Sequence, residues 1–266
     1  MWVFRQLDSV LRGEGTRADQ LRDGRLSVSG RAMLVAVVLL GAFYGACMGC
    51  YNILTGQPGA WMQIVSSAAK VPLLFLLTLV VTFPSLYVFN ALVGSRLTLV
   101  NMLRLIMAAI GVMIAVLAGF GTIVAFFNFT TTSYPFILLL NVIVFTVAGV
   151  LGLSFLLQTL RRLVEPATKA APPAEMTTAE APPTTLEPGA LTRVQDGPTD
   201  GTVKTIFRIW VIIFALVGAQ MSWVMRPFIG SYGDDGFVWF RERGGSFFGR
   251  VFEAIVTVLG GGTGSY

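Results

Sequence analysis

Histidine is absent from the 266 residues, and cysteine occurs only at Cys47 and Cys50. The first absence removes the commonest general base, the commonest metal ligand and the usual pH switch. Two cysteines also exclude a disulfide framework. Acidic residues are missing from the whole stretch between Asp23 and Glu165. Only 12% of the chain is charged, against about 25% in soluble domains, which excludes an ordinary soluble globular protein and a chain disordered throughout.

Apolar residues make up 55% of the chain, and the mean hydropathy is +0.74. This composition argues against a nucleic-acid partner, although 19 Lys and Arg outnumber 14 Asp and Glu. The apolar residues gather in runs near the roughly 20 residues that cross a bilayer core of ~30 Å. They predict an all-α integral membrane protein, a bundle of about five transmembrane helices over residues 32–54, 71–93, 99–127, 134–160 and 206–224.

The segments between these runs differ in character. The stretch from Val164 to Val203 has seven prolines, eight threonines and no aromatic residue, too little apolar surface to offset chain entropy. The first dozen residues fit either an interfacial amphipathic helix or a frayed polar terminus. We predict a cytoplasmic amphipathic or polar arm (1–31), a four-helix transmembrane unit (32–162), a disordered Pro/Thr-rich cytoplasmic linker (163–204), a fifth transmembrane helix (205–228) and a C-terminal tail with a short amphipathic helix (229–266).

The distribution of Lys and Arg predicts the orientation. The first apolar run begins too far from Met1 for a cleaved signal, so we interpret it as a signal anchor. With the N-terminus in the cytoplasm, fourteen basic residues lie inside and five outside, the latter being Lys70, Arg226, Arg241, Arg243 and Arg250. The bias predicts an inner (plasma) membrane protein with a cytoplasmic N-terminus and a periplasmic C-terminus. Alternatively, the fifth run does not cross and the tail returns inside.

Two stripes of small residues occur at every fourth position, a pattern that lets helices approach closely. The first is Gly41, Gly45 and Gly49, and the second is Gly111, Ala115 and Gly119. Both predict helix packing, either within the bundle or between protomers. Which helix packs on which cannot be read from the spacing.

Polar residues beside helix breaks and span ends predict a contact site. In the second run, Pro84 removes a helical hydrogen bond close to Asn90, which forms either a hinge with a polar pocket or a static kink. In the fifth run, Gln220 can bond across helices, and Trp223 and Arg226 suit the headgroup boundary as a contact site or an anchor. The candidate contact residues are Pro84, Asn90, Arg104, Gln220, Trp223 and Arg226.

Residues 84–97 and 218–228 resemble a group of bacterial multi-pass inner-membrane proteins to which no reaction is assigned. The five-span layout more loosely resembles the Yip1-like membrane proteins. Neither resemblance implies a catalytic residue. The pair of cysteines in the first run has no basic neighbour to stabilise a thiolate, and no set of metal ligands is evident. We therefore expect no cofactor and no metal.

The absence of catalytic groups favours a non-enzymatic structural or scaffolding subunit of a bacterial membrane complex. Its small-residue faces would pack against other membrane subunits or a second copy, and its arm and linker would recruit cytoplasmic partners. The alternative is a transporter or channel for an anion or a lipid. It would not be proton-coupled, because the spans contain no acid or histidine. Its path would be lined by Arg104, Asn141, Gln158 and Gln220.

Overall fold

The computed structural model describes residues 2–12, 29–54, 59–93, 99–164, 200–226, 228–229, 237–241 and 245–260. Regular structure in these ranges is entirely α-helical: α1 (Trp2–Leu11), α3 (Gly30–Gly49), α4 (Tyr51–Leu54), α5 (Ala60–Val93), α6 (Leu99–Thr130), α7 (Tyr134–Val164), α8 (Asp200–Met225) and α9 (Phe247–Leu259). The predicted linker at 163–204 falls mostly outside the described residues.

Five helices in the described part of the chain are long and apolar enough to cross a membrane. This confirms the predicted fold class. The apolar spans are Gly30–Ile53, Ala60–Ser85, Met102–Thr130, Tyr134–Thr159 and Arg208–Met225.

The predicted start of the second span at residue 71 is wrong, because α5 begins at Ala60. Lys70, which the sequence places outside the span, therefore lies inside the helix, as does Pro72. The prediction failed because Lys70 was read as the polar edge of the span. In the structure Lys70 is only 3% exposed, because other parts of the protein cover it.

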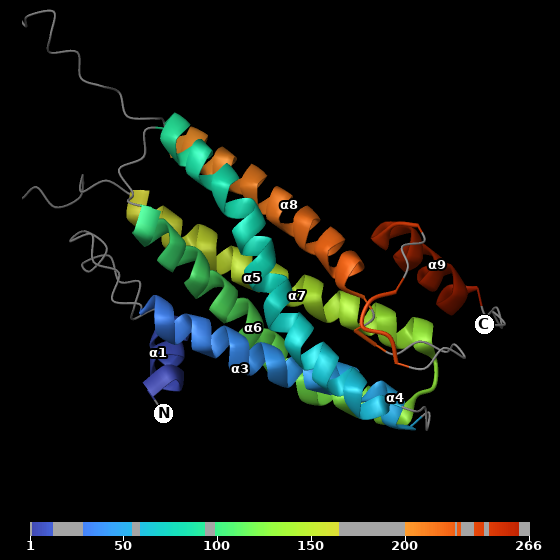
Figure 1. The fold of residues 1–266 in the computed structure, drawn as a ribbon. Helices are drawn as coiled ribbons and strands as arrows, with labels where there is room; N and C mark the ends of the chain where they lie inside the picture. The colour runs from blue at the N-terminus through green and yellow to red at the C-terminus, as the bar shows by residue number, and fades with distance from the viewer. Residues whose placement is uncertain are drawn as a thin grey trace, which may run out of the picture.

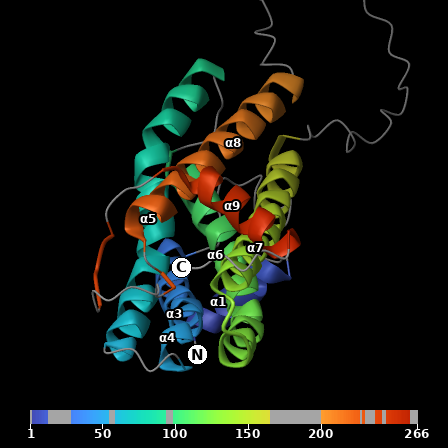
Figure 2. The same cartoon turned by 90° about the vertical axis from the view of Figure 1, so that its right-hand side faces the viewer.

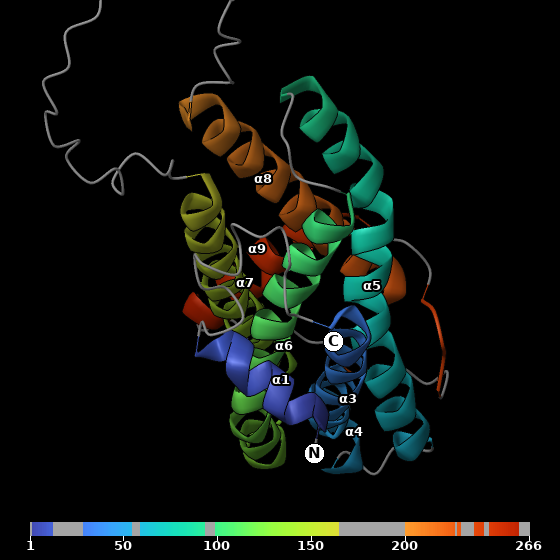
Figure 3. The same cartoon turned by 90° about the vertical axis from the view of Figure 1, so that its left-hand side faces the viewer.

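The helices α3, α5, α6 and α7 form a bundle, and α8 runs along the outside of α5 (Figures 1 and 2). Helix α1 lies across α3 and α6 (Figure 3), with Leu7 and Val10 buried against them. The start of α3 is tied to it by the backbone N–H of Ser29, which donates to Gln6 Oε1 at 3.0 Å. We call this end of the bundle the α1 end, and the opposite end, where α4 and α9 lie, the α4 end.

Polar side chains tie the helices together inside an apolar core. Tyr44 on α3 donates its hydroxyl to Asn141 Oδ1 on α7 at 2.9 Å. Asn128 near the end of α6 donates to the carbonyl of Cys47 at 2.8 Å, close to where α3 ends. The outward faces carry large exposed apolar side chains, as a surface facing lipid requires.

The first glycine stripe packs on α5. A Cβ built on Gly45 would lie 2.8 Å from Ala68 Cα, and one on Gly49 would lie 2.8 Å from Ile64 Cα. A Cβ on Gly41 would lie 3.2 Å from Pro72 Cβ. Because only glycine leaves room for this approach, the stripe sets the distance between α3 and α5.

The second stripe does not form one continuous contact within the chain. Gly111 faces Met33 and Leu7, so that a Cβ there would lie 3.0 Å from the Met33 sulfur. Ala115 is half-buried against the core. Gly119 is exposed, and a Cβ built on it would meet nothing within 4 Å. The stripe follows a helix face that turns gradually from the core to the surface.

Candidate functional site

At the α4 end of the bundle, helix α8 stops short of the start of α5. It runs antiparallel to α5 (Figure 1), and Gly218 lies beside Thr78, with the glycine's Cβ position 3.7 Å from Thr78 Cγ2. From Gly218 the helix continues for seven residues to Met225, about 10 Å at 1.5 Å per residue. Its end is therefore level with the neighbourhood of Lys70. The first ten residues of α5 extend beyond α8, and the chain that follows Met225 packs against them.

The chain that follows Met225 is not helical, and part of it is buried at the same level as the membrane spans. Phe228 and Ile229 are 9% and 5% exposed. We call the described residues 226, 228–229 and 237–241 the strap. Non-helical backbone at membrane depth needs protein partners for its polar groups. The strap therefore requires donors on the helices that it touches.

Three side chains on one face of α5 supply these donors. Gln63 Nε2 donates to the Phe228 carbonyl at 2.9 Å, and Ser67 Oγ donates to the same oxygen. Lys70 Nζ donates to the Trp239 carbonyl. Spacings of four and three residues place the donors on one helical face, and each is at most 3% exposed. We call these three side chains and two carbonyls the carbonyl latch.

The ammonium of Lys70 is held by more than the carbonyl. It also lies 4.9 Å from the centroid of the Phe240 ring, within range of a cation–π attraction. A charged side chain inside a membrane span is expensive and marks a functional site by default. Here the strap provides the compensating partners, and the strap's own carbonyl is satisfied in return.

A second set of contacts ties the end of α8 to the strap and to α9. The Arg226 guanidinium lies 3.9 Å over the Trp223 ring, and the Arg241 N–H donates to the Arg226 carbonyl at 3.3 Å. The Trp223 indole donates to the Gly245 carbonyl at 3.1 Å, next to the start of α9. Burial, followed by repulsion from Arg250 and Arg241, lowers the pKa of Arg226 from its ordinary value.

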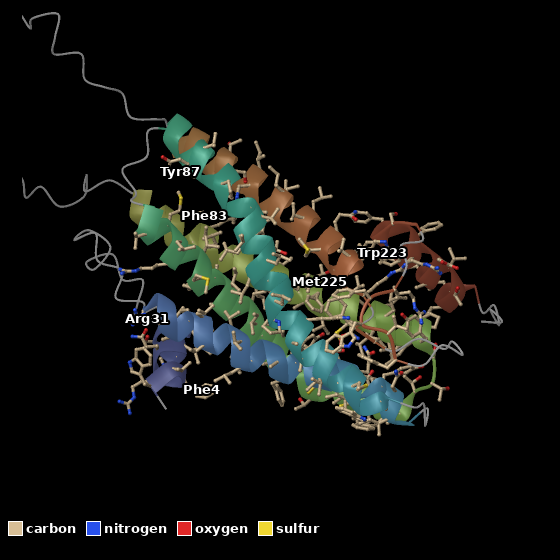
Figure 4. The ribbon with its side chains drawn as sticks, in the orientation of Figure 1. Phe4, Arg31, Phe83, Tyr87, Trp223 and Met225 are labelled. Carbon is tan, nitrogen blue, oxygen red and sulfur yellow. The ribbon has the colours of Figure 1, made fainter. Side chains whose placement is uncertain are left out.

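The predicted contact residues divide between the two ends of the bundle, and Figure 4 labels Trp223 at the end of α8. Trp223 and Arg226 meet at the end of α8. Pro84 is exposed in the last third of α5, and Arg104 is half-buried near the start of α6, so both lie toward the α1 end. No single site brings all of these residues together.

The two remaining contact residues also stand apart from this arrangement. Gln220 is exposed on α8. Asn90 lies in α5, and its side chain is outside the described part of the structure.

The residues considered for a transport path do not converge either. Asn141 is 3% exposed and takes part in the bond to Tyr44. Gln158 and Gln220 are exposed on α7 and α8. Within the described residues, no group of three or more His, Cys, Asp or Glu side chains could hold a metal ion.

Sequence reasoning missed the carbonyl latch. The available signal was the polar spacing of Gln63, Ser67 and Lys70 directly before an apolar run, which marks one face of a helix. Its partners could not be read, because Phe228 lies 165 residues from Gln63 and is recognised only through its backbone. Fold and spans define the class as a multi-pass, all-helical membrane protein.

Comparison with protein-family models, with curated proteins and with solved structures found no match.

Proposed function

We propose that this protein is a non-enzymatic structural or scaffolding subunit of a bacterial inner-membrane complex. Its N-terminus would lie in the cytoplasm and its C-terminus in the periplasm. The arm and the linker would recruit cytoplasmic partners, and the membrane faces would pack against other subunits. The resemblance of residues 84–97 and 218–228 to bacterial inner-membrane proteins is consistent with this setting.

The observation that carries the proposal is how the spans use their polar groups. The buried polar side chains of the described spans bond to backbone or to neighbouring helices, apart from the Ser66 hydroxyl and one oxygen of Asn128. A path for a polar solute needs such groups to face an opening. Three of these groups, Thr78, Thr82 and Thr159, donate to carbonyls of their own helices. The others tie α7 and α6 to α3 and tie α5 to the strap, and these ties hold the bundle in one arrangement, which is what a scaffold requires.

Co-purification tests this proposal. The tagged protein, expressed at native level, is extracted in a mild detergent, and the copurifying proteins are identified and quantified by mass spectrometry. A different membrane protein at fixed stoichiometry supports a scaffolding subunit. A chain that leaves the membrane alone, at every detergent concentration that keeps it folded, contradicts it.

One observation favours transport of an anion or a lipid as a second candidate. Lys70 places a cation inside the apolar layer, where basic residues mark anion paths. In this case the strap would act as a movable cover over Lys70. Liposome flux of an anion or a labelled lipid, lost in Lys70→Met and in Arg104→Ala, would favour transport, whereas absence of flux in the unmodified protein rules it out.

A further inference from the structure

Helix α8 presents a continuous outward stripe. Only 17% of its apolar span is buried, against 50% for α5, because α8 contacts the bundle mainly along its α5 side. Exposed side chains recur at every fourth position along α8: Arg208, Ile212, Leu216, Gln220 and Val224. Because each step of four residues turns about 40° around the helix, the last three share one face, and we call Leu216, Gln220 and Val224 the α8 stripe.

Gln220 is the unusual member of the α8 stripe. Its neighbours along the stripe, Leu216 and Val224, are apolar and suit lipid. No hydrogen bond of the Gln220 side chain is found within the described structure, and a hydrocarbon chain cannot provide one.

The depth of Gln220 makes this absence significant. Gly218, two residues earlier, lies beside Thr78. Thr78 is seven residues inside the Ser85 end of the α5 span and eighteen from its Ala60 end. At 1.5 Å per residue, these are about 10 and 27 Å of helix. Gln220 is therefore level with the inner part of the α5 span, and on its own helix it is five residues, about 7.5 Å, from the Met225 end of the α8 span.

We propose that the α8 stripe is an interface with a second copy of this chain, centred on Gln220. A carboxamide carries both a donor and an acceptor, so two copies related by a twofold axis can exchange a pair of N–H···O bonds. Insertion gives both copies the same orientation, so each Gln220 meets its counterpart at the same depth. Leu216 and Val224 then pack on either side. This inference rests on the proposed function and names one partner of the assembly.

The experiment is cysteine crosslinking in native membranes. Cys47→Ser and Cys50→Ser provide a cysteine-free background. Leu216→Cys is introduced there with Gln220 retained, and disulfides are formed with a membrane-permeant oxidant. We expect a crosslinked species with twice the mass of the chain. Adding Gln220→Leu to Leu216→Cys should weaken self-association about tenfold, the effect of losing a pair of interhelical hydrogen bonds, and reduce the crosslinked fraction accordingly.

The matched control is Gln158→Cys on α7. This glutamine is also exposed, but it lies one residue from the end of its span, where its amide reaches the headgroup layer. We expect little homodimer from it. Correct folding of each variant is checked by its elution profile in mild detergent.

Any of three results overturns the inference. Folded Leu216→Cys and Val224→Cys proteins form no crosslink, or Gln220→Leu leaves the crosslinked fraction unchanged, or the mass of the product shows that the partner is a different polypeptide. These outcomes separate the two proposals. A copurifying subunit without crosslinks along α8 leaves the scaffold standing and removes this interface. A crosslinked homodimer with no other protein removes the scaffold and keeps the interface.

Discussion

Replacing Gly45 by alanine tests the close approach of α3 and α5. The added Cβ would lie 2.8 Å from Ala68 Cα and 2.7 Å from the carbonyl carbon of Ser67. Carbon atoms in favourable contact are about 3.5–4.0 Å apart, so the helices would have to separate by about 1 Å. Both neighbours are backbone atoms in the middle of α5, and no side-chain rotation relieves the overlap.

The magnitude follows from two opposing effects. Overpacking against backbone costs about 3 kcal/mol, the upper part of the usual range. Alanine recovers about 1 kcal/mol relative to glycine in a helix interior. The net loss of about 2 kcal/mol corresponds to an apparent melting temperature about 4–8 °C lower, which is measured by heating the protein in mild detergent and following the monodisperse fraction.

Two other glycines serve as graded controls. Gly119→Ala meets nothing within 4 Å and should melt at or slightly above the temperature of the unmodified protein. Gly41→Ala, whose Cβ would lie 3.2 Å from the Pro72 side chain, should fall between the two. If Gly45→Ala melted together with Gly119→Ala, the argument that this stripe sets the α3–α5 distance would be refuted.

Further predictions concern single hydrogen bonds. Lys70→Met leaves a strap carbonyl without its donor, which costs about 1–3 kcal/mol of stability. It should speed maleimide labelling of a cysteine placed in the strap, and unchanged labelling contradicts the latch. Tyr44→Phe should lower the free energy of unfolding by about 0.6–1.7 kcal/mol, and this loss should vanish in an Asn141→Ala background. Trp210→Phe removes the indole bond to the Thr82 carbonyl, 3.2 Å long, but this oxygen also accepts from a serine hydroxyl. Loss of the hydrogen bond should therefore cost no more than about 1 kcal/mol. The smaller ring adds a cavity cost, because Trp210 is only 1% exposed, and the sum is measured as a fall in melting temperature.

The sequence was sufficient for the number of spans and for the first glycine stripe, because both depend on local properties. An apolar run long enough to cross a bilayer forms a helix wherever it lies, since no other structure satisfies its backbone. Small residues at every fourth position likewise produce a smooth face whatever the partner. The identity of the partner depends on topology, so Gly45 could be assigned to a contact but not to α5.

The start of the second span could not be predicted because the environment of Lys70 is not local. In an isolated helix, a lysine at this position would mark the boundary with water. In the fold, its charge is met by the Trp239 carbonyl, 169 residues away in the chain, and by the Phe240 ring. Since neither partner is recognised by a sequence pattern near Lys70, hydropathy places the boundary eleven residues too late, at residue 71 and not at Ala60.

The carbonyl latch also bears on how the tail is placed. Lys70 no longer counts as an outer-loop charge, which strengthens the predicted excess of basic residues inside. The bonds from α5 to Phe228 and Trp239 hold the strap at the α4 end, whereas α8 begins at the α1 end. A chain whose fifth run returned to the α1 end could not make these bonds. The latch can therefore form only if α8 runs from the α1 end to the α4 end of the bundle. A change that releases the strap also releases the constraint on where the tail emerges.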